Sequence, residues 1–534
     1  MIDVWSDGKA GAAAAEHDFS LSPYDHSLDG VVLRGRRLVQ DTRELEAGDI
    51  FVALGRPGVS ALPYIDDAFR RGASAALVDA AAVPAGDVPA RDVPAGGVPA
   101  RVHRVAGLAA SLGRIAADFT GNPSRALDIV GITGTNGKTS TAHLLTQAWE
   151  LLGVPSATIG TLGAGITGQP RINMGMTTPQ VTTLHQYLAD FVAAGVTTVA
   201  MEVSSHALAQ HRVAGVKFDT VVFTNLTRDH LDYHGTMQEY AAQKAKIFTL
   251  PGVRTAIVNL DDEHAAAHFE RLQSEDRFSH LRLIGMSSHG DSRATARAES
   301  VRLTTGGLEF ELVIGQSRHP VTSSLIGRFN VDNLLACATV LYAQNHPADQ
   351  IAAVLSPLTP VVGRMTRIQP DPTLPLVVVD AGHTPDAVEQ AVTALRESGH
   401  QRIITVFGAT GDRDPGKRPE MARIAERGSD LVIVTDDDVH FEDGDQILDD
   451  IRAGFERPEL VIEIRDRAAA IGYAIAAAGP NDVVLLQGKG HEPYQIVGDE
   501  RVPFSDLETA DRVLRERSLK GRPEQVRGSK ERTR

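Results

Sequence analysis

The sequence predicts three α/β domains, two of them built around mostly parallel sheets. The chain has 534 residues, which is too many for one ordinary hydrophobic core. From about residue 127 onward, short β-branched runs alternate with longer stretches of helical pattern, as is typical of βαβ units. Nearly every apolar run then ends in a burst of Gly, Asp, Glu, His, Asn or Lys. Ligands bind outside the carboxyl ends of strands in open parallel sheets, so two domains are expected to have ligand-binding faces.

The first predicted domain covers residues 1–122. Residues 48–79 contain an apolar strand, a loop, a helical stretch and another strand, which together predict a small α/β unit. A Val-Pro-Ala motif recurs every five residues over 83–101, and proline at that density prevents helix and ladder formation. We therefore expect an exposed low-complexity insertion there.

The second predicted domain covers residues 123–358, and the third covers residues 359–516. The second is expected to form strands at LDIVGIT, VTTVAMEVS, DTVVFTNL and TAIVNLD. The third is expected to form strands at LPLVVVDAG, RIITVFGATGD, DLVIVTDDD and DVVLLQGKG. The polar, charged tail over 517–534 is expected to be disordered.

Composition and charge narrow the possible functions. A net charge of −15 argues against a nucleic-acid partner, because nonspecific binding of the phosphate backbone needs a basic surface. The N-terminus lacks the features of a signal peptide, and no apolar run could span a bilayer, so we expect a cytoplasmic protein without membrane insertion. The single cysteine, Cys337, argues against a disulfide framework and is expected to be a buried packing thiol.

Residues 131–145, GITGTNGKTSTAHLL, predict a phosphate-binding loop at the start of a helix. Glycine recurs every third residue here, whereas the common P-loop has the spacing G-x-x-x-x-G-K-[ST]. Glycines let backbone N–H groups turn toward phosphates, the helix N-terminus adds partial positive charge, and Lys138 adds a full one. Thr139 can place its hydroxyl on Mg²⁺. The alternative is a purely structural strand-to-helix turn.

Two further residues suggest a metal site near this loop. Glu202 and His230 follow successive predicted strands of the same sheet. Considered singly, each would more often be a surface or core residue. Their shared placement favours ligation of Mg²⁺, which needs oxygen-rich sites.

Eight motifs resemble those of the Mur ligase family and occur in this order: GITGTNGKTST, MTTP, MEVSSHALAQHRV, TNLTRDHLDYHG, GRFNVDNLLA, VVGRM, GDRD and GKGHE. The chain is most similar to the family's MurE type, the UDP-N-acetylmuramoyl-tripeptide synthetases, over about residues 39–510. The resemblance implies an N-terminal UDP-binding domain, a central ATPase domain of P-loop type and a C-terminal Rossmann-like domain that binds the amino acid. It also accounts for the unusual glycine spacing.

The resemblance implies roles for individual residues. The ATP phosphates would be held by Gly134, Thr135, Asn136, Gly137, Lys138, Thr139 and Ser140. The rest of the nucleotide would contact Asn330, Asn333, Arg364 and Asp380. Thr139 and Glu202 would hold one Mg²⁺, His230 would help hold a second, and Lys244 would add a further Mg²⁺ ligand. The UDP-muramoyl dipeptide would contact Thr42, Thr177, Thr178, Ser204, Gln210 and Arg212.

Lys244 is assigned by the family pattern within EYAAQKAKIF, which implies a carbamate on its side-chain nitrogen (N6-carboxylysine). A carbamate would turn this cation into an oxygen ligand for Mg²⁺. The pattern selects Lys244 rather than Lys246. Without the resemblance, an exposed helical lysine is the expectation. Lys138, Lys244 and His230 are the predicted catalytic residues.

The implied reaction joins a free diamino acid to UDP-N-acetylmuramoyl-L-alanyl-D-glutamate. ATP would phosphorylate the γ-carboxylate of D-Glu, and an amine would then displace phosphate from the acyl phosphate. Positioning and charge neutralisation would supply most of the catalysis. The partners expected are therefore these two substrates, and the protein is expected to be a monomer.

The identity of the diamino acid depends on the segment TDDDVHFED. Relatives that add meso-2,6-diaminopimelate carry Asp-Asn-Pro-Arg where this chain has Asp437, Asp438, Val439 and His440. Histidine lacks the planar fork with which arginine grips a carboxylate, and the nearby acids would favour an ammonium group. We therefore predict L-lysine or ornithine, with meso-diaminopimelate as the alternative. The α-carboxylate and amino groups, which all the candidate amino acids share, would contact Arg413, Gly488 and Glu492.

Two other functions remain as alternatives. A folylpolyglutamate synthase-like ligase would use the same ATP chemistry, but the MEVSSHALAQHRV and GKGHE segments argue against it. A nucleotide-binding protein without catalysis would not need Lys138, Thr139, Glu202, His230 and Lys244 together.

Overall fold

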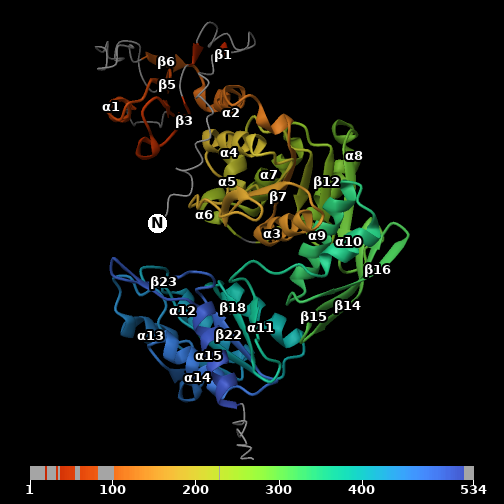
Figure 1. Cartoon of the computed structure of the whole chain (residues 1–534), viewed down its shortest axis with the longest axis vertical. Coiled ribbons are helices and arrows are strands. Elements are labelled where there is room, and N and C mark those ends of the chain that lie inside the picture. Colours follow the sequence, from red (N-terminus) through yellow and green to blue (C-terminus); the bar gives the residue numbers. More distant parts are fainter. Residues whose placement is uncertain are drawn as a thin grey trace, which may run out of the picture. The chain divides into compact units, whose positions relative to one another are not determined.

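The computed structural model describes residues 19–20, 32–33, 36–54, 61–81, 101–227 and 229–521. These residues form two compact units (Figure 1). The first contains the chain up to Met286 together with Thr339–Asn345, and the second contains Ser287–Ala338 together with the chain from His346 onward. Within the described residues, no helix is both long and apolar enough to cross a bilayer.

The first unit begins with a four-stranded parallel sheet in the order β3 (Leu38–Val39), β4 (Ile50–Ala53), β5 (Ala75–Asp79) and β6 (Arg101–Val105). Alternate residues of β4 are buried in different clusters. Ile50 and Val52 pack in the cluster that includes α2 (Leu108–Phe119), whereas Phe51 and Ala53 pack in the one that includes α1 (Leu62–Arg70). Both faces of the sheet are therefore covered, as parallel strands require. The predicted insertion at 83–101 lies outside the described residues apart from its last residue, which begins β6.

A larger sheet in the same unit carries the loop that is predicted to bind phosphate. Seven of its strands follow the order β9 (Gly163–Ile166), β8 (Ser156–Gly160), β10 (Thr198–Glu202), β7 (Asp128–Thr133), β11 (Thr220–Phe223), β12 (Thr255–Asn259) and β13 (Arg282–Ser287). All pairs are parallel except β8 with β9. The four strands predicted here are β7, β10, β11 and β12. Because β7 lies between β10 and β11, the residues that follow these three strands meet at one edge.

The helices of this unit follow the strands in sequence. They are α3 (Lys138–Leu151), α4 (Val181–Ala193), α5 (Ser205–Ala209), α6 (Leu231–His234), α7 (Met237–Ala245) and α8 (Glu263–Ser274). The short 3-10 turns are η1 (Thr42–Glu44), η2 (Pro123–Arg125), η3 (Lys246–Thr249) and η4 (Asp276–Phe278). A separate two-stranded ladder pairs β1 (Phe19–Ser20) with β2 (Val32–Leu33).

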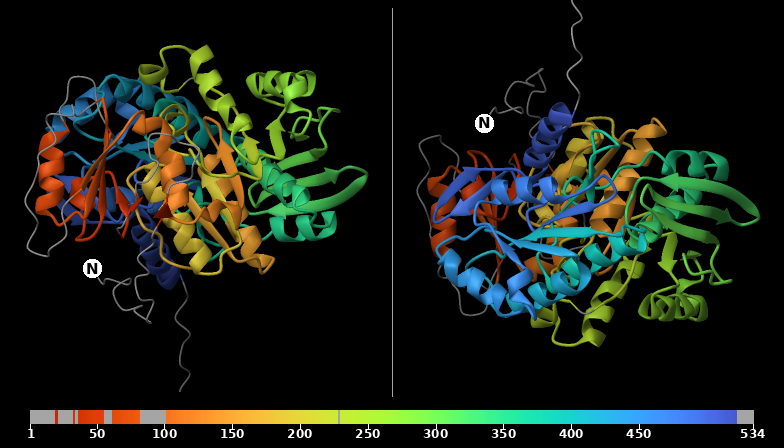
Figure 2. Two further views of the ribbon diagram at one scale, coloured as in Figure 1. Left: turned by 90° about the horizontal axis from the view of Figure 1, so that it is seen from above. Right: turned by 90° about the horizontal axis from the view of Figure 1, so that it is seen from below.

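The second unit opens with an antiparallel meander of β14 (Ala296–Thr304), β15 (Gly307–Ile314) and β16 (Ser317–Ser323). Both views of Figure 2 show these strands, in green, side by side. The helices α9 (Phe329–Ala343) and α10 (Ala348–Leu355) follow them in sequence. Cys337 lies on α9 and is buried, as predicted.

The C-terminal sheet has the order β17 (Thr366–Ile368), β18 (Leu376–Asp380), β22 (Val483–Gln487), β19 (Ile403–Phe407), β20 (Leu431–Val434) and β21 (Ile462–Glu463). All pairs are parallel except β17 with β18. One cluster packs α11 (Pro385–Glu397), α12 (Lys417–Gly428) and α13 (Gly444–Arg452) against it. A second packs α14 (Arg467–Ala477) and α15 (Asp506–Gly521). The predicted α/β fold, with one sheet in each of three regions, is confirmed.

Three smaller features complete this region. A hairpin pairs β23 (Tyr494–Val497) with β24 (Glu500–Pro503), and η5 spans Pro458–Leu460. Helix α15 continues to Gly521, past the predicted start of the tail at residue 517. Residues 522–534 lie outside the described part of the chain.

Candidate active site

The loop between β7 and α3, which is predicted to bind phosphate, contains two glycines with positive φ angles. Gly134 and Gly137 have φ angles of 149° and 85°, which side-chain-bearing residues rarely adopt. A Cβ on Gly134 would lie 1.8 Å from Thr224 Oγ1, so this position has no room for a side chain. Gly131, in contrast, lies within β7, where a Cβ would meet the Phe218 ring at 2.8 Å. The first glycine of the motif therefore serves packing, and the other two shape the loop.

Two residues that follow β11 hold this loop in place. The Asn136 N–H donates to Asn225 Oδ1 at 2.9 Å, and the Thr135 N–H donates to the Asn225 carbonyl at 2.9 Å. Thr224 Oγ1 donates to the Asn136 carbonyl at 2.7 Å. Sequence reasoning missed both Thr224 and Asn225, although they lie in the TNLTRDH motif. They pre-organise the loop, which lowers the entropy cost of binding a ligand there.

Two lysines converge on the carbonyl of Gly134. Lys138 Nζ donates to it at 2.9 Å and to the Thr135 carbonyl at 2.9 Å, and Lys244 Nζ donates to it at 2.7 Å. Lys138 is the first residue of α3, so its charge adds to that of the helix N-terminus. The structure thus brings together two of the three predicted catalytic residues.

Lys244 is a buried residue, not the exposed helical lysine that composition alone suggests. Its relative exposure is 1%, and its Nζ lies 4.7 Å from the Tyr240 ring centroid. Burial, followed by the nearby charge of Lys138, lowers the pKa of Lys244 to about 6. Lys246, two residues later, is exposed. At neutral pH the Lys244 amine is therefore mostly uncharged and nucleophilic.

Glu202, at the end of β10, accepts three hydrogen bonds at the edge of the loop. Thr139 Oγ1 donates to its Oε2 at 2.8 Å, and Thr161 donates through its N–H at 2.9 Å and its hydroxyl at 3.1 Å. Burial raises the pKa of Glu202, and Lys138 opposes this shift. Thr161 was missed by sequence reasoning, although it follows β8, the neighbour of β10. A carboxylate beside a hydroxyl is a donor set that suits Mg²⁺.

His230 lies in a group of aromatic side chains that includes Tyr240, whose ring Lys244 contacts. Its ring centroid is 4.8 Å from that of His206 and 6.3 Å from that of Tyr240. His230 has a φ of 51° at the start of α6, and its Nε2 lies 3.4 Å from Asp229 Oδ2. No cluster of three or more His, Cys, Asp or Glu side chains with metal-binding geometry occurs among the described residues. A metal ion here would need hydroxyl, carbamate or phosphate oxygens as additional ligands.

Five of the six residues predicted to contact the dipeptide substrate lie near the carboxyl end of β10. Thr178 Oγ1 donates to the Glu202 carbonyl at 2.9 Å and accepts from the Ser204 N–H at 3.2 Å. Arg212 donates to the Thr178 carbonyl at 3.0 Å and to Gln210 Oε1 at 2.6 Å. Thr177 Oγ1 lies 3.1 Å from Thr161 Oγ1. Thr42 lies apart from this group in sequence, in η1 beside the N-terminal sheet.

In the second unit, the residues predicted to contact the nucleotide fall into two groups. Asn333 Nδ2 donates to Asn330 Oδ1 at 2.9 Å near the start of α9, and Asn330 Nδ2 donates to the Ile326 carbonyl at 2.8 Å. Asp380 accepts from the backbone N–H groups of Met365 and Gly382 at 3.0 and 2.9 Å. Both Asp380 oxygens thus bind protein groups, and they hold the turn that presents the exposed Arg364.

Asp437 and Asp438, which follow β20, surround a buried lysine. Lys489 Nζ lies 2.8 Å from Asp438 Oδ1, 3.2 Å from Glu492 Oε2 and 3.5 Å from Asp437 Oδ1, and its side chain is fully buried. Sequence reasoning missed Lys489, although it is the lysine of GKGHE. Gly488 has a φ of 120°, and a Cβ there would lie 2.9 Å from Asp437 Oδ2.

Arg418, also missed, links the loops that follow β19 and β20. Its side chain is fully buried and donates to both oxygens of Glu442 at 2.6 Å and to Asp450 at 2.8 Å. Glu442 Oε2 also accepts from the Asp412 N–H at 2.9 Å. These bonds lower the pKa of Glu442 to about 2. The neighbouring Arg413 is exposed on the first of these loops.

Replacing Arg418 with methionine is expected to destabilise the protein by about 3 kcal/mol, because it leaves two carboxylates without their buried partner. Urea unfolding would measure the change. Arg452→Met is a matched control, since Arg452 is exposed and pairs with Asp449 and Glu463; it should cost under about 1 kcal/mol. Equal losses for the two variants would show that the Arg418 cluster has no special role.

Comparison with known proteins gives consistent matches over most of the chain. Residues 132–341 match the Mur ligase middle domain, and residues 363–490 match the Mur ligase glutamate ligase domain. The chain is 51% identical over 477 residues to a UDP-N-acetylmuramoyl-L-alanyl-D-glutamate–2,6-diaminopimelate ligase of Xanthomonas campestris pv. campestris, covering 89% of this chain and 93% of that one. A ligase of the same name from Pseudomonas putida is 45% identical, covering 90% and 95%.

A solved structure of a ligase with the same name is also similar to this chain. The structure of a UDP-N-acetylmuramoyl-L-alanyl-D-glutamate–2,6-diaminopimelate ligase is 30% identical in sequence, with a TM-score of 0.67. The match covers 91% of this chain and 96% of that one.

These relatives contradict the prediction of L-lysine or ornithine, because each is named as a 2,6-diaminopimelate ligase. The physical reason lies in the acids on which that prediction depended. Asp438 pairs with Lys489, and Glu442 pairs with Arg418. Asp443 caps α13 by accepting from the Asp445 N–H. Each of these three carboxylates already binds another protein group, so they are not free carboxylates that would select an ammonium group.

Proposed function

Because this chain belongs to the Mur ligase family, and to its MurE type of ATP-dependent ligases in peptidoglycan precursor synthesis, we propose that it adds 2,6-diaminopimelate to UDP-N-acetylmuramoyl-L-alanyl-D-glutamate. The observation that carries this proposal is the 51% identity, over 89% of the chain, to a ligase named for that reaction. The proposed substrate is therefore diaminopimelate, which was the alternative in the sequence analysis, and not L-lysine or ornithine.

The first step would be phosphoryl transfer from ATP to the γ-carboxylate of D-Glu. The carboxylate oxygen attacks the γ-phosphorus, the bond to the β-phosphate oxygen breaks, and ADP leaves. The loop from Gly134 to Ser140 would hold the phosphates, with Lys138 supplying positive charge. Thr178, Ser204 and Arg212 would orient the dipeptide, a role supported by their contacts at the end of β10.

The donor set at the end of β10 fits Mg²⁺. Thr139 and Glu202 would hold one ion, His230 would help hold a second, and a carbamate on Lys244 would add an oxygen ligand. The ions would neutralise charge on the phosphates when bound. Burial raises the pKa of Glu202, and a bound cation would oppose that shift.

The second step would form the amide. An amine of diaminopimelate attacks the acyl carbon, the bond to the phosphate oxygen breaks, and inorganic phosphate and a proton leave. The exposed Arg413 would bind a carboxylate of the amino acid. Glu492, which already accepts from Lys489, would bind its ammonium group.

The proposal predicts phosphate release that depends on diaminopimelate. The purified chain would be assayed with ATP, Mg²⁺ and UDP-N-acetylmuramoyl-L-alanyl-D-glutamate, with meso-diaminopimelate, L-lysine or L-ornithine offered separately. Diaminopimelate should give a kcat/KM at least about 100-fold above the other two, because a site that binds a second carboxylate strongly rejects substrates lacking it. Comparable rates with lysine would contradict the proposal, and no release with any of the three would refute the ligase activity itself.

A further inference from the structure

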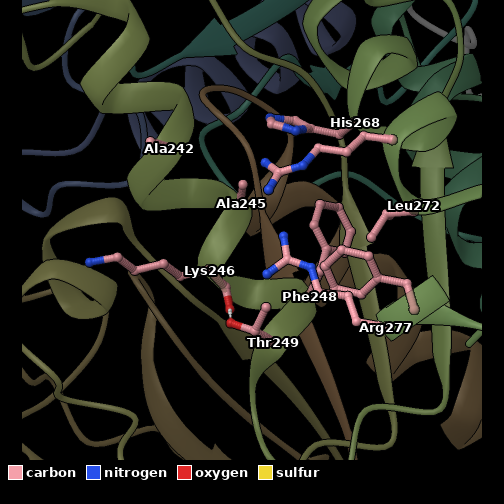
Figure 3. Close-up of a pocket in the computed structure, with 10 residues that line it drawn as sticks. Ala242, Ala245, Lys246, Phe248, Thr249, His268, Leu272 and Arg277 are labelled. Atoms are coloured by element: carbon pink, nitrogen blue, oxygen red, sulfur yellow. Dashed lines mark hydrogen bonds between the residues drawn. The ribbon is translucent and has the colours of Figure 1, made fainter. Parts of the chain in front are cut away.

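A pocket in the first unit is separate from the residues assigned to the ligase reaction. It lies between the segment α7–η3 and the segment α8–η4 and has a volume of about 180 Å³ (Figure 3). Ala242, Ala245 and Phe248 line it from the first segment. Leu272 and Phe278 line it from the second.

The interior of the pocket is mainly apolar but contains one unpartnered polar atom. Phe248, Leu272 and Phe278 are buried. The ring of His268 lies with its centroid 6.1 Å from that of Phe248. His268 Nε2 is shielded from solvent and has no hydrogen-bond partner among the described residues.

The rim of the pocket carries two arginines that share one acid. Arg271 and Arg277 each donate through Nε to a different oxygen of Glu275, at 2.5 and 2.6 Å. Within the part of the chain that the structure describes, their terminal nitrogens form no hydrogen bond or ion pair, and the Arg277 guanidinium carbon lies 4.6 Å from the Phe278 ring centroid. Two guanidinium groups against one carboxylate leave a net positive charge, and the remaining N–H groups can bind an anion. Lys246 extends away from the aromatic rings (Figure 3).

We propose that this pocket binds a small organic carboxylate with a ring-sized apolar body. The apolar body would occupy the space beside Phe248 and Phe278, and the carboxylate would bind the terminal nitrogens of Arg271 and Arg277. The size is appropriate, because a dry cavity of about 150 Å³ is large enough for benzene. A fully polar anion such as phosphate would leave the aromatic interior unfilled.

The position of the pocket connects it to the active site. Ala245 and Lys246 directly follow Lys244, whose Nζ contacts the Gly134 carbonyl of the phosphate loop. A ligand in the pocket would therefore contact the segment that positions Lys244. Binding itself does not depend on the proposed ligase reaction and can be measured without it.

The test uses 4-fluorophenylacetate as the probe and follows its ¹⁹F NMR signal during titration with the full chain. The wild-type protein should bind it in a saturable manner, and the double variant Arg271→Gln/Arg277→Gln should bind at least about tenfold more weakly. The neutral analogue 4-fluorophenylacetamide should also bind at least about tenfold more weakly to the wild type. Ala242→Trp, which fills the mouth of the pocket, should abolish binding.

Arg302→Gln provides the matched control, because Arg302 is exposed and pairs with Glu309 at 2.6 Å elsewhere in the chain. It should bind the probe as the wild type does. Unchanged affinity in the double variant, equal binding of the amide, or binding by the Ala242→Trp variant would each overturn the proposal. Thermal unfolding of every variant would verify that it is folded.

Discussion

Replacing Lys244 with alanine is expected to lower the rate of ligation by about 10³-fold, the scale of losing a group that stabilises transition-state charge. Lys244 is buried and its pKa is lowered to about 6. A neutral amine has the lone pair needed to react with CO₂, whereas an ammonium does not. The alanine variant would have neither the carbamate nor any group in its place. Lys246→Ala should stay within about twofold of wild type, because Lys246 is exposed.

The modification itself can be measured separately from the rate. Wild-type protein in ¹³C-bicarbonate should show one carbamate signal by NMR, and Lys244→Ala should show none. As the pH falls through about 6, the amine becomes protonated, so the signal and the activity should fall together. A wild-type protein without the signal, or an alanine variant that keeps more than about a tenth of the rate, would contradict the assignment.

The strands of the two large parallel sheets could be predicted because they are buried on both faces. Such strands appear in the sequence as continuous apolar runs, and β7, β10, β18 and β22 all have this form. The meander β14–β16 was not predicted. In β14 the buried residues Ala296 and Ala298 alternate with more exposed ones, so it presents no apolar run.

Candidate site residues could be selected from the sequence where a polar residue directly follows a strand, but the residues that they contact could not. Thr139 and Glu202 are 63 positions apart and 2.8 Å apart in space because β7 and β10 are neighbours. The order of strands in the sheet differs from their order along the chain, so the sequence did not show that β7 and β10 are neighbours. Thr161 and Asn225 act through hydrogen bonds to Glu202 and to the loop, so no motif marks them by themselves.

The wrong prediction of L-lysine or ornithine also arose because contacts between residues far apart in the sequence were not known. Counting acids near His440 gives a negative segment, but the local field depends on what those acids contact. Arg418 lies 24 positions from Glu442, and Lys489 lies 51 positions from Asp438. A charge count over a short segment omits both cations. The specificity of such a loop can be inferred only once its buried partners are known.

Lys138→Met is expected to lower kcat by about 10³-fold, or roughly 4 kcal/mol of transition-state stabilisation. Methionine keeps the length of the side chain and removes its charge. The Gly134 and Thr135 carbonyls hold the ammonium of Lys138 across the loop, at the start of α3. That position lets it neutralise charge on the transferred phosphoryl group, which the backbone N–H groups alone cannot do.

Loss of Lys138 should also change the pH dependence of the reaction. Its charge lowers the pKa of Glu202 against the effect of burial, and adds to the effect of burial in lowering the pKa of Lys244, so removing it raises both pKa values. The carboxylate then becomes protonated at higher pH, and the acid limb of the activity profile should move upward. Initial rates across pH for Lys138→Met and for the control Lys246→Met would measure both effects. If Lys138→Met lowered the rate without moving the acid limb, Lys138 would act on the nucleotide alone; an unchanged rate would exclude it from catalysis.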